Sequence, residues 1–221
     1  MEEVKAQLFK HGPLYASRRD IVKEIKDRVQ TGDIFVRLGS ESFLGIPFSK
    51  LTARVTESEW SHATVALREG DEVYMAEVND RGTQKDRLID WIDYCTSGAF
   101  EVYRLKDATP EEIERLRQET TKFLEDDPDY DFTFNEEGNF YCTESVAQIY
   151  ERAGIHLVDP KPMKELIYQR AYFIILPLNW IIGKLWKKRI PTNLPLYVVG
   201  NANKGILSSP RLEFILRHEE I

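Results

Sequence analysis

The first hundred residues carry one helical pattern followed by several strand patterns. Apolar residues at three- and four-residue spacing predict an amphipathic helix over about 17–30. A short apolar run at 34–36 predicts a strand. Two longer apolar runs, 63–67 and 72–78, flank a polar turn around Gly70 and predict a β-hairpin. This hairpin determines which residues of the region face one another.

The second part of the chain adds a strand and two helices. The run 100–105 predicts a strand, and 109–112 has the residues of a helix start, with Pro and Glu at its first and third helical positions. A second helix is predicted over 142–153, closed by Gly154. The segment 39–58 is rich in Ser, Gly and Thr and predicts a loop or an irregular helix. Strands mixed with separate helices, without a repeating βαβ unit, predict an α+β fold.

Composition and charge restrict the class of protein. The chain has 221 residues, of which 42% are hydrophobic and 30% charged, a balance typical of a globular domain. We predict a single domain over 1–221, with its core at about 31–153, an N-terminal helix, and helical and aromatic additions on the C-terminal side. Thirty Lys and Arg against 37 Asp and Glu give a net charge of −7, which argues against a nucleic-acid partner.

The most apolar segment, 171–186, is too short for a membrane-spanning helix, which needs about 20 apolar residues. The favoured interpretation is a buried helix and its continuation. The alternative is an interfacial patch, because basic residues at 184–189 adjoin the aromatic ones and suit membrane-surface contact through 171–189. No apolar leader follows Met1, so we expect a cytoplasmic protein, a leader already removed being the alternative.

Three residues suit one kind of catalysis. His62 stands where a loop enters a strand, Glu77 lies in the paired strand, and Cys142 opens a helix. The hairpin brings residues near 62 and 77 roughly opposite each other, so the carboxylate is available to orient the imidazole. The exposed N–H groups at a helix start favour a thiolate. Together the three residues form a nucleophile, a proton shuttle and an orienting group.

Each of these residues also has an ordinary structural interpretation. A lone histidine at a strand start is more often a surface or hydrogen-bonded residue than a catalyst, and a single cysteine at a helix start is more often a small buried apolar residue. Glu77 is also consistent with an exposed edge residue. Their joint placement favours catalysis, because three separate positions suit one mechanism. Spacing alone leaves both interpretations open.

No metal or other cofactor is expected. The sequence has no CxxC pair, and no two histidines are four residues apart. The four histidines are His11, His62, His156 and His218. Cys95 and Cys142 are too few for a disulfide framework and fit a reducing compartment or a thiol kept for chemistry. The segment 200–205 has the composition of a turn rather than of a phosphate-binding loop.

Five short motifs follow one another along the chain in a characteristic order. They are Gly32-Asp33-Ile34, Ser61-His62, Ala76-Glu77, Tyr130-Asp131 and Tyr141-Cys142-Thr143-Glu144. This series resembles the YiiX/YebB-like permuted papain-like amidases of the NlpC-type cysteine peptidase superfamily. In that branch the histidine strand comes first and the cysteine helix last, the reverse of the superfamily's usual order. The resemblance spans about 31–153, and a weaker similarity is present at 205–210.

The resemblance implies a role for each matched residue. Cys142 would be the nucleophile, His62 the general base and Glu77 the orienting residue. Tyr130 and Tyr141 would bind substrate, and Tyr141 with the N–H of Cys142 would contribute to an oxyanion hole. The implied fold is a permuted papain-like α+β fold, with an antiparallel sheet packed against helices and the nucleophile at a helix N-terminus.

The implied function is a cysteine amidase or peptidase that forms an acyl-enzyme on a peptide or small molecule with an amide bond. A cell-wall peptide and an acyl amide are both suitable substrates. The alternative is a lipid acyltransferase or phospholipase like lecithin:retinol acyltransferase. That branch usually has a second histidine where Glu77 stands, and an Asn-Cys-Glu motif around the position of Cys142. A binding module that has lost activity is the third interpretation, and the intact set of three residues argues against it.

The aromatic segment after residue 168 has no counterpart in the family pattern. Tyr172 and Phe173 are too apolar for a free surface, whereas the basic residues at 184–189 must reach solvent. We therefore predict that Tyr172 and Phe173 wall the substrate cleft, the alternative being that they complete the core.

Overall fold

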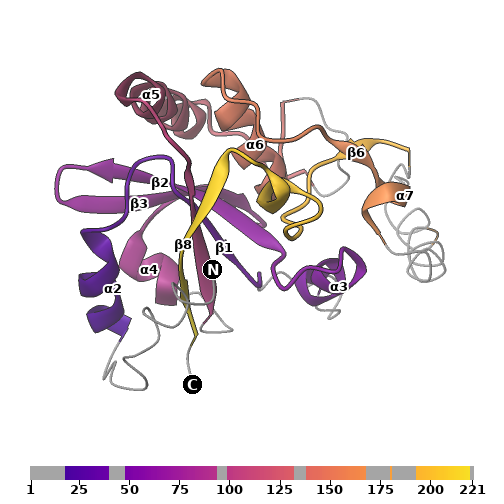
Figure 1. The fold of residues 1–221 in the computed structure, drawn as a ribbon, viewed down its shortest axis with the longest axis horizontal. Coiled ribbons are helices and arrows are strands. Elements are labelled where there is room, and N and C mark those ends of the chain that lie inside the picture. The colour runs from indigo at the N-terminus through magenta and orange to yellow at the C-terminus, as the bar shows by residue number, and fades with distance from the viewer. Residues whose placement is uncertain are drawn as a thin grey trace.

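One six-stranded antiparallel sheet forms the centre of the molecule (Figure 1). The computed structural model describes residues 18–39, 48–93, 99–131, 138–167, 180 and 193–219. The strand order is β4-β3-β2-β1-β5-β8. The strands are β1 (Ile34–Arg37), β2 (His62–Glu69), β3 (Glu72–Asn79), β4 (Gly82–Arg87), β5 (Phe100–Leu105) and β8 (Leu212–His218). All four strands predicted from the hydrophobic pattern are present.

Helices cover both faces of this sheet. In Figure 1, α5 and α6 lie on one side of the sheet, and α2 and α4 lie on the other. The helices are α2 (Arg18–Lys26), α3 (Phe48–Val55), α4 (Leu88–Asp93), α5 (Pro110–Asp126), α6 (Cys142–Arg152) and α7 (Met163–Leu166). A short ladder of β6 (Lys161–Pro162) and β7 (Pro195–Leu196) and a 3-10 turn (Ile206–Ser208) complete the described elements. The architecture is the predicted α+β fold.

The two sheet faces belong to separate hydrophobic clusters, because successive strand residues point to opposite sides. On the first face, Val36 and Val65 pack with Leu116 of α5 and Val146 of α6. The second face packs against α2 and α4 through Phe35, Met75, Trp91 and Ile25. This alternation decides on which side of the sheet each polar strand residue emerges.

The first helix is shorter than its pattern predicts. Helix α2 ends at Lys26, although Val29 is still buried. The Arg68 side chain of β2 explains the early end, because it donates to the carbonyl oxygens of Lys26 and, at 3.0 Å from Nε, of Val29. A guanidinium from the neighbouring strand thus takes the acceptors that a further helical turn would use. The segment 39–58, predicted as a loop or irregular helix, contains the regular helix α3.

The predicted start of α5 is confirmed in detail. Thr109 is the N-cap, its Oγ1 accepts from the Glu112 N–H at 3.2 Å, and its own N–H donates to Glu112 Oε2 at 2.9 Å. This is a capping box followed by Pro110 at the first helical position. The second helix, α6, ends at Arg152 and is followed by Gly154 in a left-handed conformation, as the pattern predicts.

The Gly32-Asp33 motif has a clear structural function at the start of β1. Gly32 has a φ of +89°, and a Cβ there would lie 2.7 Å from Leu116 Cδ1. Asp33 is buried and accepts two hydrogen bonds of 2.8 Å from Arg104. The glycine therefore allows α5 to approach the strand, and the carboxylate joins β1 to β5.

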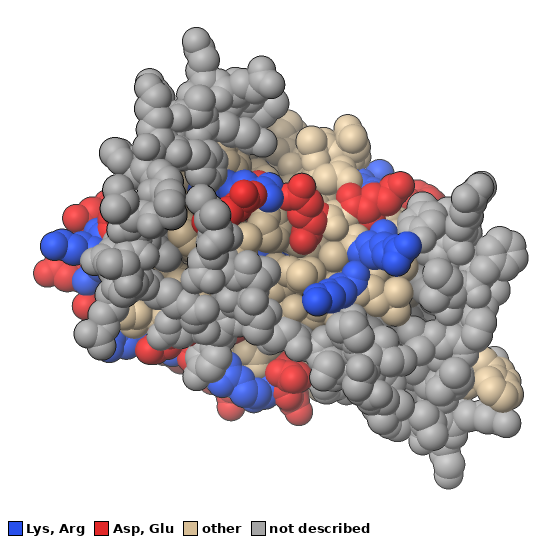
Figure 2. Space-filling view, turned by 90° about the horizontal axis from the view of Figure 1, so that it is seen from below, with Lys and Arg blue, Asp and Glu red and all other residues tan. Residues whose placement is uncertain are grey.

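Several predictions from the C-terminal side fall outside the described residues. Tyr172, Phe173 and nearly all of 171–189 are among the residues that the structure does not describe. Cys95, earlier in the chain, is outside the described residues as well. Within the described part of the chain, no helix is both long and apolar enough to cross a membrane. On the face shown in Figure 2, acidic and basic side chains of the described residues lie interspersed.

Candidate active site

His62 and Glu77 lie on one face of the central hairpin and are joined by a hydrogen bond. The ladder pairs Val65 with Ala76, which places His62 and Glu77 diagonally across from each other rather than directly opposite. His62 Nε2 lies 2.7 Å from Glu77 Oε2, and both side chains are buried. The predicted hydrogen bond between imidazole and carboxylate is confirmed.

Both oxygens of the Glu77 carboxylate have donors. Trp91 Nε1 donates to Oε2 at 2.8 Å, beside the His62 bond, and Asn79 Nδ2 donates to Oε1 at 2.8 Å. Arg37 Nη2 lies 3.7 Å from Oε1. Arg37 is itself held against Trp91, because its Nη1 donates to the Trp91 carbonyl oxygen at 3.1 Å and its guanidinium lies 4.5 Å from the ring centroid. These contacts fix the Glu77 carboxylate and hold Oε2 in place for the hydrogen bond with His62.

The charges around Glu77 keep it ionised in a buried position. Burial raises the pKa of the Glu77 carboxyl. The His62 charge and hydrogen bond, with Arg37 and the Trp91 N–H, outweigh this effect and lower the pKa to about 2. A permanent negative charge beside His62 stabilises the imidazolium form and holds Nε2 protonated.

Cys142 opens α6 next to the segment that leads into β2. Its side chain is buried, with 7% exposed. The thiol donates to the carbonyl oxygen of Ser61 at 3.7 Å and lies 3.8 Å from Thr143 Oγ1. Ser61 directly precedes His62, so the fold brings together two segments that are 80 residues apart in the sequence.

The thiol and the imidazole flank the start of β2. Strand alternation places His62 on the sheet face that α4 covers. His62 pairs with Arg37, and Arg37 lies two residues after Phe35, whose side chain packs on that face. Helix α6 packs on the other face, and the Cys142 sulfur touches the chain where the strand begins. A direct contact between His62 Nδ1 and the Cys142 sulfur stays a prediction.

Tyr141 anchors the start of the nucleophile helix. It is the N-cap residue of α6 and is buried among Leu166, Leu196 and their neighbours. Its hydroxyl accepts a hydrogen bond of 2.6 Å from the Tyr197 N–H. Burial, with the nearby Glu144 charge, raises the pKa of the Tyr141 hydroxyl well above its ordinary value, so the phenol stays neutral. A role for Tyr141 in binding substrate stays a prediction.

Tyr130 lies next to the same helix start. It forms a parallel bridge with Phe140, and the Asp131 N–H donates to the Phe140 carbonyl oxygen at 3.0 Å. Its half-buried side chain packs against the cluster that contains Tyr141. These contacts are compatible with the predicted role in lining the site, which stays a prediction.

Glu144, in the first turn of α6, carries a carboxyl that titrates near neutrality. Burial raises its pKa to about 7, helped by the negative charge of Asp131 and opposed by a hydrogen bond from the Tyr141 backbone. The ionised form is therefore disfavoured two residues from the thiol. The sequence contains no signal for this shift, because it arises from tertiary burial.

Glu144→Gln should change stability in a pH-dependent way. The folded pKa of about 7 lies above the ordinary value of 4.5, so the contribution of Glu144 is fully present below about 4.5 and is lost as the pH rises through 7. The variant should match the native Tm at pH 4 and exceed it at pH 8. Thermal unfolding at both pH values checks this, with Glu165→Gln at an exposed position as the control. An equal Tm difference at both pH values would contradict the assignment.

Two further residues of the site escaped sequence reasoning. Trp91 and Arg37 contact Glu77 across 14 and 40 positions of sequence, and nothing local marks them. Asn79 carried a usable signal, since it lies two residues after Glu77 in a strand and therefore on the same face. Within the described ranges, no group of three or more His, Cys, Asp or Glu side chains is placed to hold a metal ion.

Comparisons with known proteins identify the family and the fold of the chain. Residues 29–216 match the model of a family described as permuted papain-like amidase enzyme, YaeF/YiiX, C92 family. No curated protein matches the chain. Among solved structures, the chain is similar to the crystal structure of metalloprotein yiiX from Escherichia coli O157:H7, with 22% sequence identity and a TM-score of 0.69. The likeness covers 86% of this chain and 98% of that one, and at this identity it shows a shared fold.

Proposed function

Because the chain belongs to the permuted papain-like amidase family YaeF/YiiX, we propose that it hydrolyses an amide bond with Cys142 as nucleophile, His62 as general base and Glu77 as positioning residue. The observation that carries this proposal is the buried His62–Glu77 hydrogen bond of 2.7 Å at the strand end touched by the Cys142 sulfur. A histidine held by a carboxylate beside a cysteine at a helix start is the arrangement that thiol catalysis requires.

The proposed reaction has two halves. His62 accepts the thiol proton, and the Cys142 sulfur attacks the amide carbonyl carbon to form a tetrahedral intermediate. This intermediate collapses when the imidazolium gives its proton to the leaving nitrogen, which leaves a thioester on Cys142. In the second half His62 takes a proton from water, and the hydroxide attacks the thioester carbonyl. The imidazolium then returns this proton to the departing Cys142 sulfur, which releases the acid and restores the free thiol. Glu77 holds the ring in one orientation throughout.

The negative oxygen of both tetrahedral intermediates needs hydrogen-bond donors. The N–H of Cys142 lies in the first turn of α6, where backbone N–H groups have no acceptor within the helix. The positive end of the helix dipole favours negative charge at the same place. We assign this N–H to the oxyanion hole, with Tyr141 fixing the helix start through its bond to Tyr197.

The substrate we propose is a peptide or acyl amide, as in a cell-wall-peptide fragment. The test is incubation of the purified protein with peptidyl 4-nitroanilides, N-acyl amides and a phosphatidylcholine vesicle, with products identified by mass spectrometry. Amide cleavage that depends on Cys142 supports the proposal. Release of fatty acid or acyl transfer from the phospholipid alone would instead show a lipid enzyme, and no turnover of any substrate would indicate a binding module.

Iodoacetamide should alkylate Cys142 before Cys95 near neutral pH. Cys142 opens a helix and is proposed to act with His62, whereas Cys95 follows Trp91 and Tyr94 with no basic partner nearby in the sequence. Peptide mapping after timed labelling measures the two rates, and His62→Asn should slow labelling of Cys142 only. Equal rates at both thiols, or faster labelling of Cys95, would count against an activated nucleophile.

A further inference from the structure

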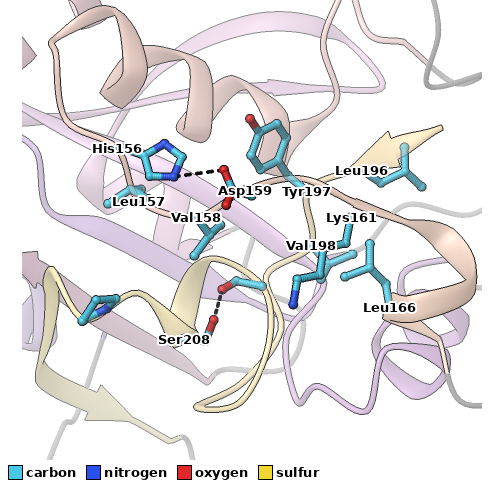
Figure 3. A pocket seen from close by; sticks show the side chains of 12 residues that line it. His156, Leu157, Val158, Asp159, Lys161, Leu166, Leu196, Tyr197, Val198 and Ser208 are labelled. Atoms are coloured by element: carbon cyan, nitrogen blue, oxygen red, sulfur yellow. Dashed lines mark hydrogen bonds and ion pairs between the residues drawn. The ribbon is translucent and has the colours of Figure 1, made fainter.

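A cavity of about 370 Å³ is lined by segments other than those that carry the proposed catalytic residues (Figure 3). It is lined by the chain after α6, the β6–β7 ladder and the turn that follows Gly205, and it opens to solvent. Figure 3 shows His156 and Leu157 at one end and Leu166 and Leu196 at the other. The volume falls within the range of small-molecule sites, at its lower end.

The interior of this cavity is aliphatic. Five leucine and valine side chains line it, of which three are buried in the protein. They are Leu157, Val158, Leu166, Leu196 and Val198. A surface of this kind favours a ligand with a short hydrocarbon side chain.

Opposite charges stand two residues apart at the mouth of the cavity. The Lys161 side chain is exposed and forms no hydrogen bond or ion pair with any described residue, so its ammonium group can meet an anionic ligand. Lys161 also pairs with Leu196 across the β6–β7 ladder, which places the charge next to the aliphatic wall. Within the described part of the chain, the Asp159 carboxylate pairs with His156 alone, at 3.3 Å, and the two side chains are 86% and 55% exposed. An exposed pair of this kind is weak and is readily exchanged for a ligand.

We propose that this cavity binds a small aliphatic zwitterion, a dipeptide with free amino and carboxylate ends. Its carboxylate would meet Lys161, its ammonium Asp159, and its side chain the leucine wall. The choice of a dipeptide follows from the pairing of one acidic and one basic side chain, two chain positions apart, with an aliphatic wall between the elements that carry them.

The cavity also touches the nucleophile helix through one residue. Tyr197 lines it and donates its N–H to the Tyr141 hydroxyl at 2.6 Å, and Tyr141 directly precedes Cys142. The Tyr197 amide resonance is therefore a reporter that responds to the cavity and to the helix start. Binding is measured without turnover, so the result is independent of the proposed amidase activity.

The experiment is an NMR titration of the full chain, labelled at leucine and valine methyl groups and at backbone amides. The probes are alanyl-leucine, which carries both charges, its C-terminal amide, which carries the positive charge alone, and its N-acetyl derivative, which carries the negative charge alone. We expect saturable shifts at the Leu157, Leu166 and Leu196 methyls. We also expect affinity for alanyl-leucine about two- to fivefold higher than for either single-charge probe.

Matched variants assign the charges. Lys161→Gln should remove the preference over the amide, Asp159→Asn should remove the preference over the N-acetyl form, and Lys164→Gln should change neither. Lys164 is exposed on α7 and does not line the cavity. Equal affinities for the three probes, unchanged preferences in Lys161→Gln, or absence of saturable shifts at the cavity methyls would each overturn the proposal.

Discussion

Cys142→Ala is expected to lower kcat for amide hydrolysis by roughly 10⁴-fold or more, while the protein stays folded. Removing the nucleophile from a catalytic set that acts as a unit costs about as much as removing the whole set. Among the described residues, the sulfur makes two weak polar contacts, with Ser61 and Thr143, so its loss leaves little unpaired. Steady-state rates on the amide substrate that the screen under Proposed function finds to be cleaved measure the effect, and circular dichroism checks the fold.

The matched control for this variant is Cys95→Ala. It removes the second thiol of the chain and should leave kcat within about twofold of native, since Cys95 is not among the proposed catalytic residues. Activity of Cys142→Ala above about one tenth of native would show that another residue attacks the carbonyl. His62→Ala should then be tested for the same residual rate.

Glu77→Gln is expected to affect both activity and stability. The amide has the shape of the carboxylate but lacks the charge that supports the His62 imidazolium, so kcat should fall by about 10²- to 10⁴-fold. It also breaks a buried charge pair and leaves the donors of Arg37 and Trp91 incompletely satisfied. Unfolding in urea should show a loss of about 3 kcal/mol or more.

The pH dependence of stability identifies the charge as the cause. The folded pKa of Glu77, about 2, lies below the ordinary value of 4.5. Its contribution is therefore present above about pH 4.5 and is lost as the pH falls toward 2. The native protein should lose stability through that interval more steeply than Glu77→Gln does. Parallel curves for the two proteins would contradict the assignment of a buried ionised carboxylate.

Glu101→Gln separates structural from catalytic effects. Glu101 is a second buried carboxylate, and it accepts from Trp60 Nε1 at 2.9 Å, Tyr103 Oη at 2.7 Å and Arg217 Nη1 at 3.1 Å. None of these contacts involves His62. This variant should lose stability much as Glu77→Gln does, whereas its kcat should remain near native. A comparable fall in kcat in both variants would mean that Glu77 acts only through the fold.

The three candidate catalytic residues were found from the sequence because each has a local sign. Cys142 opens a helix, His62 begins a strand, and Glu77 is a carboxylate among apolar strand residues. Their mutual distances depend on how α6 packs across β2, which no local pattern specifies. Trp91 and Arg37 illustrate the same limit, since both reach Glu77 only through tertiary packing.

The secondary structure was predicted best where a buried face gives a clear period. The hairpin of β2 and β3 and the capped helix α5 have such faces. The edge strand β4 was not predicted, because its sequence GTQKDR is polar on both faces. A polar edge protects the sheet from pairing with another chain, and this removes the alternation that would reveal the strand. The end of α2 was misjudged because Arg68, 42 residues away, caps it.

A covalent acyl-enzyme on Cys142 is the most direct test of the central claim. The protein is mixed with an acyl 4-nitrophenyl ester or 4-nitroanilide, quenched in acid within milliseconds to seconds, and measured by intact-protein and peptide mass spectrometry. We predict one acyl group on the peptide that contains Cys142, removable by hydroxylamine and absent in Cys142→Ala. Turnover without any adduct, or an adduct that persists in Cys142→Ala, would contradict a Cys142 nucleophile.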